Sequence, residues 1–282
     1  GRPNVGKSTL MNALVGEKVA ITSARAQTTR SRIMGVMTRE NLQIVFLDTP
    51  GVHHPRNKLG EYMMSAVKDA LDGVDAVIVM LDATDVRPTD IEIIRKYDAL
   101  GVKCALVVNK IDLVNSDTLA PLLDKLSVEK ADAFIPISAQ KKNGLDRLGK
   151  VLQGWMPEGP QYFPDDMITD QPERVIVAEM IREKALRNLR DEIPHGIGVE
   201  ILQIKKLSDS LTEIHADVYC ERDSHKSIII GKQGAMLKLI GSQARTDIER
   251  LLGTKVMLRL WVKVRVDWRN RASDLRTLGY ED

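Results

Sequence analysis

The sequence predicts a doubly wound parallel α/β fold in its first half, followed by a smaller α+β domain. In residues 1–150, stretches typical of strands alternate with stretches typical of helices. A proline-rich segment then interrupts both periodicities, and the order after it becomes helix, strand, strand, helix, helix, strand. The 282 residues are enough for two domains. We place these domains at 1–156 and 174–282, with a linker at 157–173 between them.

The strands expected in the first half are apolar runs, as buried parallel strands are. They cover 42–48, 75–82, 103–110 and 133–138, and the helices between and around them cover 7–16, 58–73, 89–100 and 144–155. Ligands of such sheets bind at the carboxyl ends of the strands. Because the first residue already belongs to a glycine-rich loop, we also expect a short apolar strand before Gly1, inserted centrally in the sheet.

The second half has its own pattern of elements. Residues 154–174 contain four prolines and two glycines, which is typical of a linker. The elements expected after it are a helix at 174–190, a hairpin of 197–209 and 211–223, a short helix before GKQG at 231–234, a helix at 235–253, a half-buried strand at 255–267 and a final short helix at 268–278.

Composition excludes several classes of protein. Hydrophobic residues make up 43% and charged residues 28% of the chain, which excludes a disordered chain. Two distant cysteines and five scattered histidines do not form the spacing of a metal site. The net charge of +2 conceals a basic block at 226–276, where 12 Lys or Arg residues stand against 4 Asp or Glu residues. A block of this density favours a polyanionic partner.

The chain opens on GRPNVGKS, which matches the phosphate-loop pattern G-x-x-x-x-G-K-[ST]. Gly1 and Gly6 let backbone amides approach phosphate oxygens, and the helix beginning at Lys7 points its positive end at the same anion. Lys7 would reach the β- and γ-phosphates, and Ser8 would bind the Mg²⁺ that bridges them. From this loop we expect nucleotide contacts by Gly1, Arg2, Pro3, Asn4, Val5, Gly6, Lys7, Ser8 and Thr9.

A second motif, LDTPG at 47–51, follows an apolar strand. Asp48 at the strand's end can hold the Mg²⁺ shell. The Gly51 amide can meet the γ-phosphate, so this segment would respond to its presence. Thr49 and Pro50, between them, complete the motif's expected nucleotide contacts.

A third and a fourth motif read the base. In VVNKID at 107–112, the Asp112 carboxylate can accept two hydrogen bonds from guanine, a donor pair that adenine lacks. Asn109 would brace the loop, and the Lys110 stem can lie along the base. ISAQ at 137–140 supplies Ser138 and Ala139, whose amide can donate to guanine O6. The four motifs occur in the order and spacing of a GTPase, which predicts binding and hydrolysis of GTP.

The segment AQTTRSR at 26–32 lies where a first switch loop belongs. A threonine there can complete the Mg²⁺ shell while the γ-phosphate is present. Thr29 is our first choice and Thr28 the second, so the expected metal ligands are Ser8, Thr29 and Asp48.

After Gly51 comes Val52, where many small GTPases place a glutamine that orients the attacking water. The valine side chain cannot hydrogen-bond to the attacking water, so intrinsic hydrolysis of GTP should be slow. His53 and His54, which follow, are interpreted as loop histidines. Related GTPases that share Asn4 can use a potassium ion as a substitute positive charge. The residues expected to carry the reaction are Asn4, Lys7, Thr29 and Gly51.

Together these stretches resemble the bacterial Era GTPases. The resemblance rests on GRPNVGKST, AQTTRSRIMGV, DTPGVHHPRNKLGEYM, NKIDLV and SAQ, and in the second half on EIPHGIGVE, ERDSHKSIIIGKQG and LWVKVRVDWRN. It implies a P-loop GTPase domain joined to a type II KH domain, with GTP or GDP and Mg²⁺ as ligands. It further implies a monomer that binds near the 3′ end of small-subunit ribosomal RNA and helps to mature the 30S subunit. Members are found in the cytoplasm and at the inner face of the cell membrane.

In a KH module, the G-x-x-G loop clamps the backbone of about four unpaired nucleotides. Here the loop is GKQG, inside the basic block. The RNA contacts that we expect are Lys226, Gly231, Lys232, Gln233, Gly234 and Lys238. Trp261 shares the strand parity of Arg259, Lys263 and Arg265, so it is either a core residue or part of a partner surface.

Two other functions stay open at this point. The first is an RNA-binding scaffold that holds GTP with little turnover. This alternative stays open because Val52 stands where a water-orienting glutamine would be expected. The second is a tRNA-modification-type GTPase that shares the phosphate loop containing Asn4. The KH-like second half argues against the latter.

Overall fold

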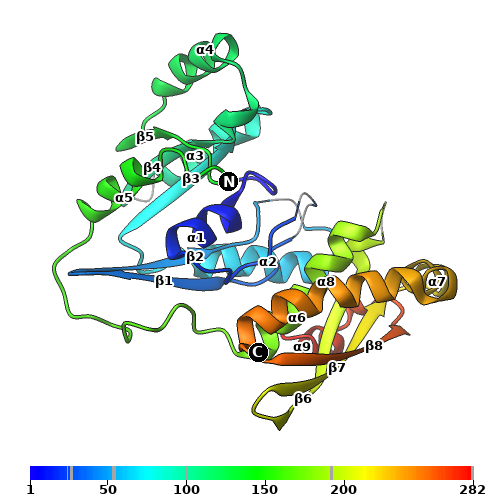
Figure 1. Ribbon diagram of the computed structural model, residues 1–282. Coiled ribbons are helices and arrows are strands. Elements are labelled where there is room, and N and C mark those ends of the chain that lie inside the picture. Colours follow the sequence, from blue (N-terminus) through cyan, green and yellow to red (C-terminus); the bar gives the residue numbers. More distant parts are fainter. Residues whose placement is uncertain (24, 26–27, 53–54, 99–100, 191–192, 281–282) are drawn as a thin grey trace. The chain divides into compact units, whose positions relative to one another are not determined.

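The computed structural model describes all residues except 24, 26–27, 53–54, 99–100, 191–192 and 281–282 (Figure 1). The chain divides into two compact units. The first contains residues 1–22, 31–53 and 64–170, and the second contains 23–30, 54–63 and 171–282. Two short segments from the first half of the sequence therefore pack with the second half. The domain boundaries expected at 156 and 174 stay a prediction.

The first unit contains the expected parallel sheet. Strands β3 (Ala76–Asp82), β4 (Lys103–Asn109) and β5 (Ala133–Pro136) pair in parallel in that order. The helices of the GTPase half are α1 (Lys7–Val15), α2 (Lys58–Asp69), α3 (Pro88–Asp98), α4 (Ser116–Ser127) and α5 (Leu145–Gln153). Leu106 on one face of β4 and Val107 on the other are both fully buried, so the sheet has a core on each side.

Two elements of this unit differ from the sequence-based expectation. Strand β2 (Leu42–Asp48) pairs antiparallel with β1 (Ile33–Arg39). Strand β1 was not expected from the sequence, because its first five residues are all buried and so show no alternation of apolar and polar side chains. Among the described residues, these two strands form a sheet separate from β3-β4-β5. Helix α4 was missed because it contains Pro121, and Asn115 caps it by accepting from the Thr118 amide at 2.9 Å.

The proline-rich segment lies along the β1-β2 sheet. The Val36 amide donates to the Ile168 carbonyl at 2.9 Å, and the Thr169 hydroxyl donates to the Met34 carbonyl at 2.7 Å. Gln43 binds the backbone of Phe163 through both side-chain atoms. Part of this segment is therefore held to the β1-β2 sheet by one backbone hydrogen bond and by side-chain hydrogen bonds of Thr169 and Gln43.

The second unit has the helix, strand, strand, helix, helix, strand order of a type II KH domain. Helix α6 (Glu173–Asn188) precedes β6 (Gly198–Ser208) and β7 (Leu211–Cys220), and α7 (Asp223–Ile230) and α8 (Ala235–Leu252) precede β8 (Lys255–Val264). The sheet order is β6-β7-β8, with β6 antiparallel and β8 parallel to β7. Figure 1 shows α6 and α8 side by side, and their apolar residues share one core with the inward-facing residues of the sheet.

A short helix closes this unit. Helix α9 (Ala272–Thr277) follows Trp268, which is fully buried and packs in one cluster with Leu275 and Tyr280. Within the described ranges, no helix combines the length and apolar character that a membrane crossing requires.

Candidate nucleotide-binding site and nucleic-acid interface

The phosphate loop has the backbone geometry that its glycines predict. Asn4 and Gly6 have positive φ values of 66° and 104°, and Gly6 caps the start of α1. Lys7 spans the loop, because its ammonium donates to the Gly1 carbonyl at 3.3 Å and to the Arg2 carbonyl at 3.0 Å. Burial lowers the pKa of Lys7, against the opposing effect of the nearby Asp48 carboxylate. The loop thus holds a half-buried cation where phosphate oxygens are expected.

Ser8 and Asp48 meet as the motif spacing predicts. The Ser8 hydroxyl donates to the Asp48 carboxylate at 2.5 Å, and Asp48 is only 5% exposed at the end of β2. A hydroxyl and a buried carboxylate are hard oxygen ligands of the kind that Mg²⁺ takes. These two residues therefore fit a magnesium ion beside the phosphate loop.

Asn109 joins three of the four motifs. Its side-chain amide donates to the Val5 carbonyl in the phosphate loop at 2.8 Å. Its side-chain oxygen accepts from the Ala139 amide in the ISAQ segment at 2.9 Å. Asn109 is 3% exposed, so both hydrogen bonds are shielded from water. A Cβ added at Gly6 would collide with this amide, so both the positive φ and the lack of space require glycine at this position.

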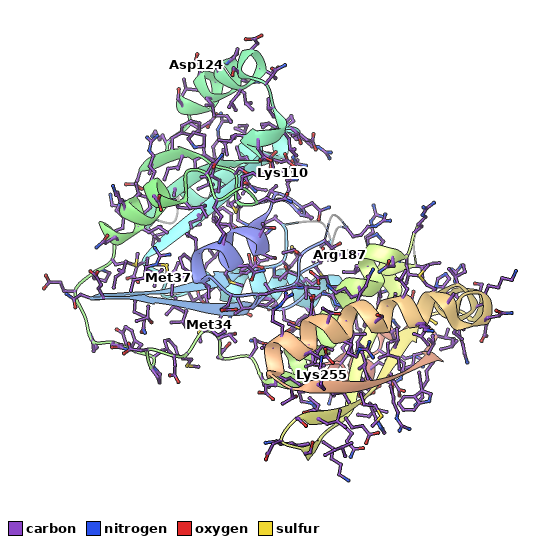
Figure 2. The ribbon with its side chains drawn as sticks, in the orientation of Figure 1. Met34, Met37, Lys110, Asp124, Arg187 and Lys255 are labelled. Carbon is purple, nitrogen blue, oxygen red and sulfur yellow. The ribbon has the colours of Figure 1, made fainter. Side chains whose placement is uncertain are left out.

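The residues expected to read the base lie at the carboxyl ends of β4 and β5. Lys110, labelled in Figure 2, has a left-handed backbone with φ 65° and forms an ion pair of 2.5 Å with Asp82. Burial works against ionisation of Asp82, but hydrogen bonds from Lys110 and Thr84 outweigh it and lower its pKa. Asp112 is exposed, so its carboxylate is accessible to a base. Ser138 is fully buried and fixes the loop by accepting from the Lys141 amide at 3.1 Å.

Gly51 packs tightly against the phosphate loop. A Cβ at Gly51 would lie 2.6 Å from the Pro3 Cα and closer still to the Pro3 nitrogen. The next amide, that of Val52, donates to the Gly1 carbonyl at 3.2 Å, and its side chain packs on the core beside β3. Valine at this position is thus a packing residue with no group to orient water. His53 and His54 lie outside the described residues.

Sequence reasoning missed the anchor of Arg2. Its guanidinium donates to the Asp90 carboxylate at 2.8 Å and to the Asp85 backbone carbonyl. Asp90 is fully buried and also caps α3 by accepting from the Arg87 amide at 2.9 Å. The hydrogen bond to Asp90 raises the pKa of Arg2. The phosphate loop is therefore fastened to the start of α3 by a pair 88 residues apart in sequence, which no local pattern signals.

Residues 28–30 of the expected first switch segment pack within the second unit. Arg182 donates to the Thr28 carbonyl, and Thr29 is 7% exposed. Arg30 is 1% exposed and donates to the Ile197 carbonyl at 2.7 Å. Its guanidinium also lies 5.5 Å from the centre of the Trp268 ring. The choice of Thr29 over Thr28 as a magnesium ligand stays a prediction.

The GKQG loop has a positive φ at three of its four residues, a conformation that glycine adopts without strain. Gly231, Gln233 and Gly234 have φ values of 72°, 52° and 78°. A Cβ at Gly231 would lie 2.7 Å from the Met236 Cβ, whereas one at Gly234 would meet no atom within 4 Å. Lys232 and Gln233 are exposed at the tip, as expected.

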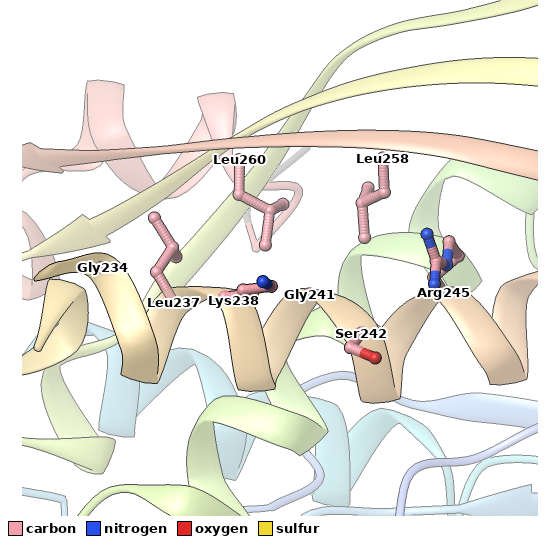
Figure 3. Close-up of a pocket in the computed structure, with 8 residues that line it drawn as sticks. All are labelled: Gly234, Leu237, Lys238, Gly241, Ser242, Arg245, Leu258 and Leu260. Carbon is pink, nitrogen blue, oxygen red and sulfur yellow. The ribbon is translucent and has the colours of Figure 1, made fainter.

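A groove of about 410 Å³ continues from this loop between α8 and β8. Figure 3 shows Leu258 and Leu260 of β8 pointing toward the helix, where Gly241 leaves room. Lys238, expected from the sequence, and Arg245 border this apolar floor, and the remaining lining residues are Gly234, Leu237 and Ser242. The two leucines were not expected here from the sequence, although the alternation of apolar and polar residues in β8 predicts that they face inward. Lys226, also expected, is half-buried on α7 and is not among these lining residues.

Comparisons with known proteins agree with both sites. A family model described as a 50S ribosome-binding GTPase matches residues 1–110, and a KH domain model matches 192–269. GTPase Era of Ruminiclostridium cellulolyticum is 51% identical over 283 residues, which cover 100% of this chain and 95% of that protein. GTPase Era of Clostridioides difficile is 52% identical over 288 residues, with 100% and 96% covered.

Solved structures of similar proteins match along the whole chain. A crystal structure of Era in complex with MgGDPNP and nucleotides 1506–1542 of 16S ribosomal RNA has a TM-score of 0.95 at 43% identity, and 100% of this chain and 97% of that chain are covered. A variant of Aquifex aeolicus Era bound to GDP·AlF4⁻ has a TM-score of 0.94 at 43% identity, with the same coverage. These full-length similarities decide against the tRNA-modification-type alternative.

Proposed function

Because this chain belongs to the GTPase Era family, we propose that it is a GTP-hydrolysing switch that assists maturation of the small ribosomal subunit. In this proposal the KH domain binds small-subunit ribosomal RNA near its 3′ end. The solved Era complex with 16S ribosomal RNA and MgGDPNP supports this choice of RNA. The family model described as a 50S ribosome-binding GTPase matches only residues 1–110, which do not include the KH domain. The observation that carries the nucleotide part is Asn109, which joins the phosphate loop to the base loop.

The proposed roles follow from the geometry of the first unit. Lys7 and the backbone amides of the phosphate loop bind the β- and γ-phosphates, and Gly51 donates its amide to the γ-phosphate. Ser8 and Asp48 hold Mg²⁺, which neutralises developing phosphate charge when bound. The exposed Asp112 accepts two hydrogen bonds from guanine. The Ala139 amide, expected from the sequence at guanine O6, donates instead to the Asn109 side chain and so holds the ISAQ loop in place. Val52 contributes nothing to water activation, so we expect slow turnover in the absence of a further positive charge.

We assign that charge to a potassium ion held near Asn4, which is exposed at the turn of the phosphate loop. Turnover of GTP should then be at least about tenfold faster in KCl than in NaCl at equal ionic strength, because a cation beside the transferring phosphate stabilises its transition state. Phosphate release is the measurement. In Asn4→Ala the difference between the two salts should disappear. Equal rates for the parent chain in both salts would refute the assignment.

In the KH domain, both the exposed tip of the GKQG loop and the groove between α8 and β8 bind RNA in this proposal. Gly231 and Gly234 bring the loop backbone close to phosphate, and the cations Lys232, Lys238 and Arg245 supply counter-charge. The apolar floor of Leu258 and Leu260 suits the flat faces of unpaired bases. Lys226 and Gln233 complete the proposed contacts. We place the protein in the cytoplasm, where this RNA is.

The sharpest test of the RNA site is Gly234→Asp against Gly234→Asn. Both side chains enter open space and both residues tolerate a left-handed backbone, so they differ in charge alone. We expect Gly234→Asp to weaken binding of a 3′-terminal small-subunit RNA by at least about tenfold, since a carboxylate would face phosphate. Gly234→Asn should stay within about threefold of the parent chain. Equal affinities of the two variants in a filter-binding assay would contradict the proposed interface.

A further inference from the structure

The face of the β6-β7-β8 sheet turned away from the helices carries a second surface. Strand β8 is at the edge of this sheet, and its residues alternate between two faces. Leu258 and Leu260 point into the groove beside α8, so Arg259, Trp261 and Lys263 belong to the opposite face. The structure thereby answers the question that spacing left open, because Trp261 is not a core residue.

Trp261 is large, apolar and 43% exposed. Its ring meets that of His215 on β7 edge to face, with centroids 5.3 Å apart and an interplanar angle of 70°. Directly opposite Trp261 in the strand register is Asp217, whose side chain is 1% exposed. The indole is thus held in place by its neighbours while almost half of it remains open to solvent.

Exposed cations flank this indole along β8. Arg259 and Lys263 stand two residues before and after it, which corresponds to about 7 Å on either side in a strand. Their side chains are 52% and 56% exposed. Arg259 binds Glu213 at 3.2 Å and Lys263 binds Asp217 at 2.6 Å, and these two carboxylates are only 15% and 1% exposed. A partner would therefore meet an aromatic ring between two cations, with the balancing carboxylates beneath them.

We propose that Trp261 stacks an unpaired base of the bound RNA after the strand leaves the groove and crosses the edge of β8. Arg259 and Lys263 then lie beside the phosphates that flank this base. The proposal rests on the proposed function, because the RNA must first bind in the groove that β8 lines. A KH groove takes about four nucleotides, so a longer unpaired strand must continue past it.

The exposed ring between two exposed cations, whose paired carboxylates lie deeper, favours RNA over a protein partner. An exposed aromatic side chain between cations is the arrangement with which proteins bind single-stranded nucleic acid, and each base stacked on such a ring adds affinity with little dependence on sequence. Arg259, Trp261 and Lys263 also belong to the basic block of 226–276 in the sequence. We therefore assign this surface to the same RNA strand.

The test uses the full chain with a GTP analogue bound and two unpaired RNA oligonucleotides. One has about four nucleotides and fills the groove alone, and the other has about ten and extends beyond it. We expect Trp261→Ala to lower the affinity for the longer RNA by on the order of tenfold, measured by fluorescence anisotropy. Its affinity for the shorter RNA should stay within about twofold of that of the parent chain. Trp261→Phe should retain most of the affinity, because a ring remains.

Two controls separate this inference from the proposed function. Leu202 on β6 is 48% exposed, and Leu202→Ala should change neither affinity. Gly234→Asp should weaken both oligonucleotides if the groove binds RNA at all. The inference about Trp261 is wrong if Gly234→Asp lowers the affinity for both oligonucleotides while Trp261→Ala lowers neither affinity or lowers both equally. The proposed groove would still stand in that case. If Gly234→Asp changes neither, the proposed RNA site fails as well.

Discussion

Replacing Asn109 with alanine is expected to weaken guanine-nucleotide binding by at least about a hundredfold, because two buried hydrogen bonds disappear together. The Val5 carbonyl would lose its donor at 2.8 Å, and the Ala139 amide would lose its acceptor at 2.9 Å. Both partners belong to loops that we expect to contact the nucleotide. Titration of the full chain with a fluorescent GDP measures the effect directly.

Two other asparagine variants make this prediction specific. Asn109→Asp keeps an acceptor for Ala139 but cannot donate to Val5, so it should lose a large part of the affinity as well. Asn115→Ala removes the cap of α4 and should cost about 1 kcal/mol of stability, with nucleotide affinity unchanged. A native affinity for Asn109→Ala would show that the three motifs do not depend on this side chain.

The second large effect concerns Trp268. Its ring is fully buried, its indole N–H donates to the Gly196 carbonyl at 2.9 Å, and it stacks on Tyr280 with centroids 6.2 Å apart. Trp268→Ala should lower the free energy of unfolding of the second unit by about 3–5 kcal/mol, because it opens a cavity and removes a hydrogen bond. Urea unfolding of the full chain, followed by circular dichroism, measures this loss.

The same variant should loosen the first switch segment. Arg30 lies 5.5 Å from the Trp268 ring and 5.7 Å from that of Tyr280, so it loses one of two aromatic contacts. Hydrogen exchange of residues 28–30 is expected to become faster in Trp268→Ala. Trp268→Phe, which keeps an aromatic ring, should be destabilised less. Unchanged unfolding in Trp268→Ala would mean that this cluster contributes nothing to the stability of the second unit.

The sequence predicted the parts of the site that are local. The phosphate loop, the strand ends at Asp48 and Asn109, and the GKQG loop each form within a few residues, because glycine conformation and strand–helix alternation are short-range properties. The order of elements in the KH half was predictable for the same reason. Strand β1 was not, since its burial on both faces leaves no period of two.

The parts that escaped prediction depend on distant residues. The bonds of Arg2 to Asp90 and of Asn109 to Val5 join residues 88 and 104 positions apart. Arg30 follows two threonines in a polar run, which reads as a solvated loop, yet it is buried against carbonyl groups of Ile197 and His195. Strand parity placed Trp261 with the cations but could not say which face of β8 meets α8. Such pairings are decided by the packed fold.

The central claim is that this GTP-binding chain acts on the 3′ end of small-subunit ribosomal RNA. Crosslinking the full-length protein to RNA in cells, followed by sequencing of the bound fragments, tests it most directly. We predict enrichment of that 3′ end, lost in Gly234→Asp and retained in Gly234→Asn. Enrichment of transfer RNA, or of large-subunit ribosomal RNA, would contradict the claim.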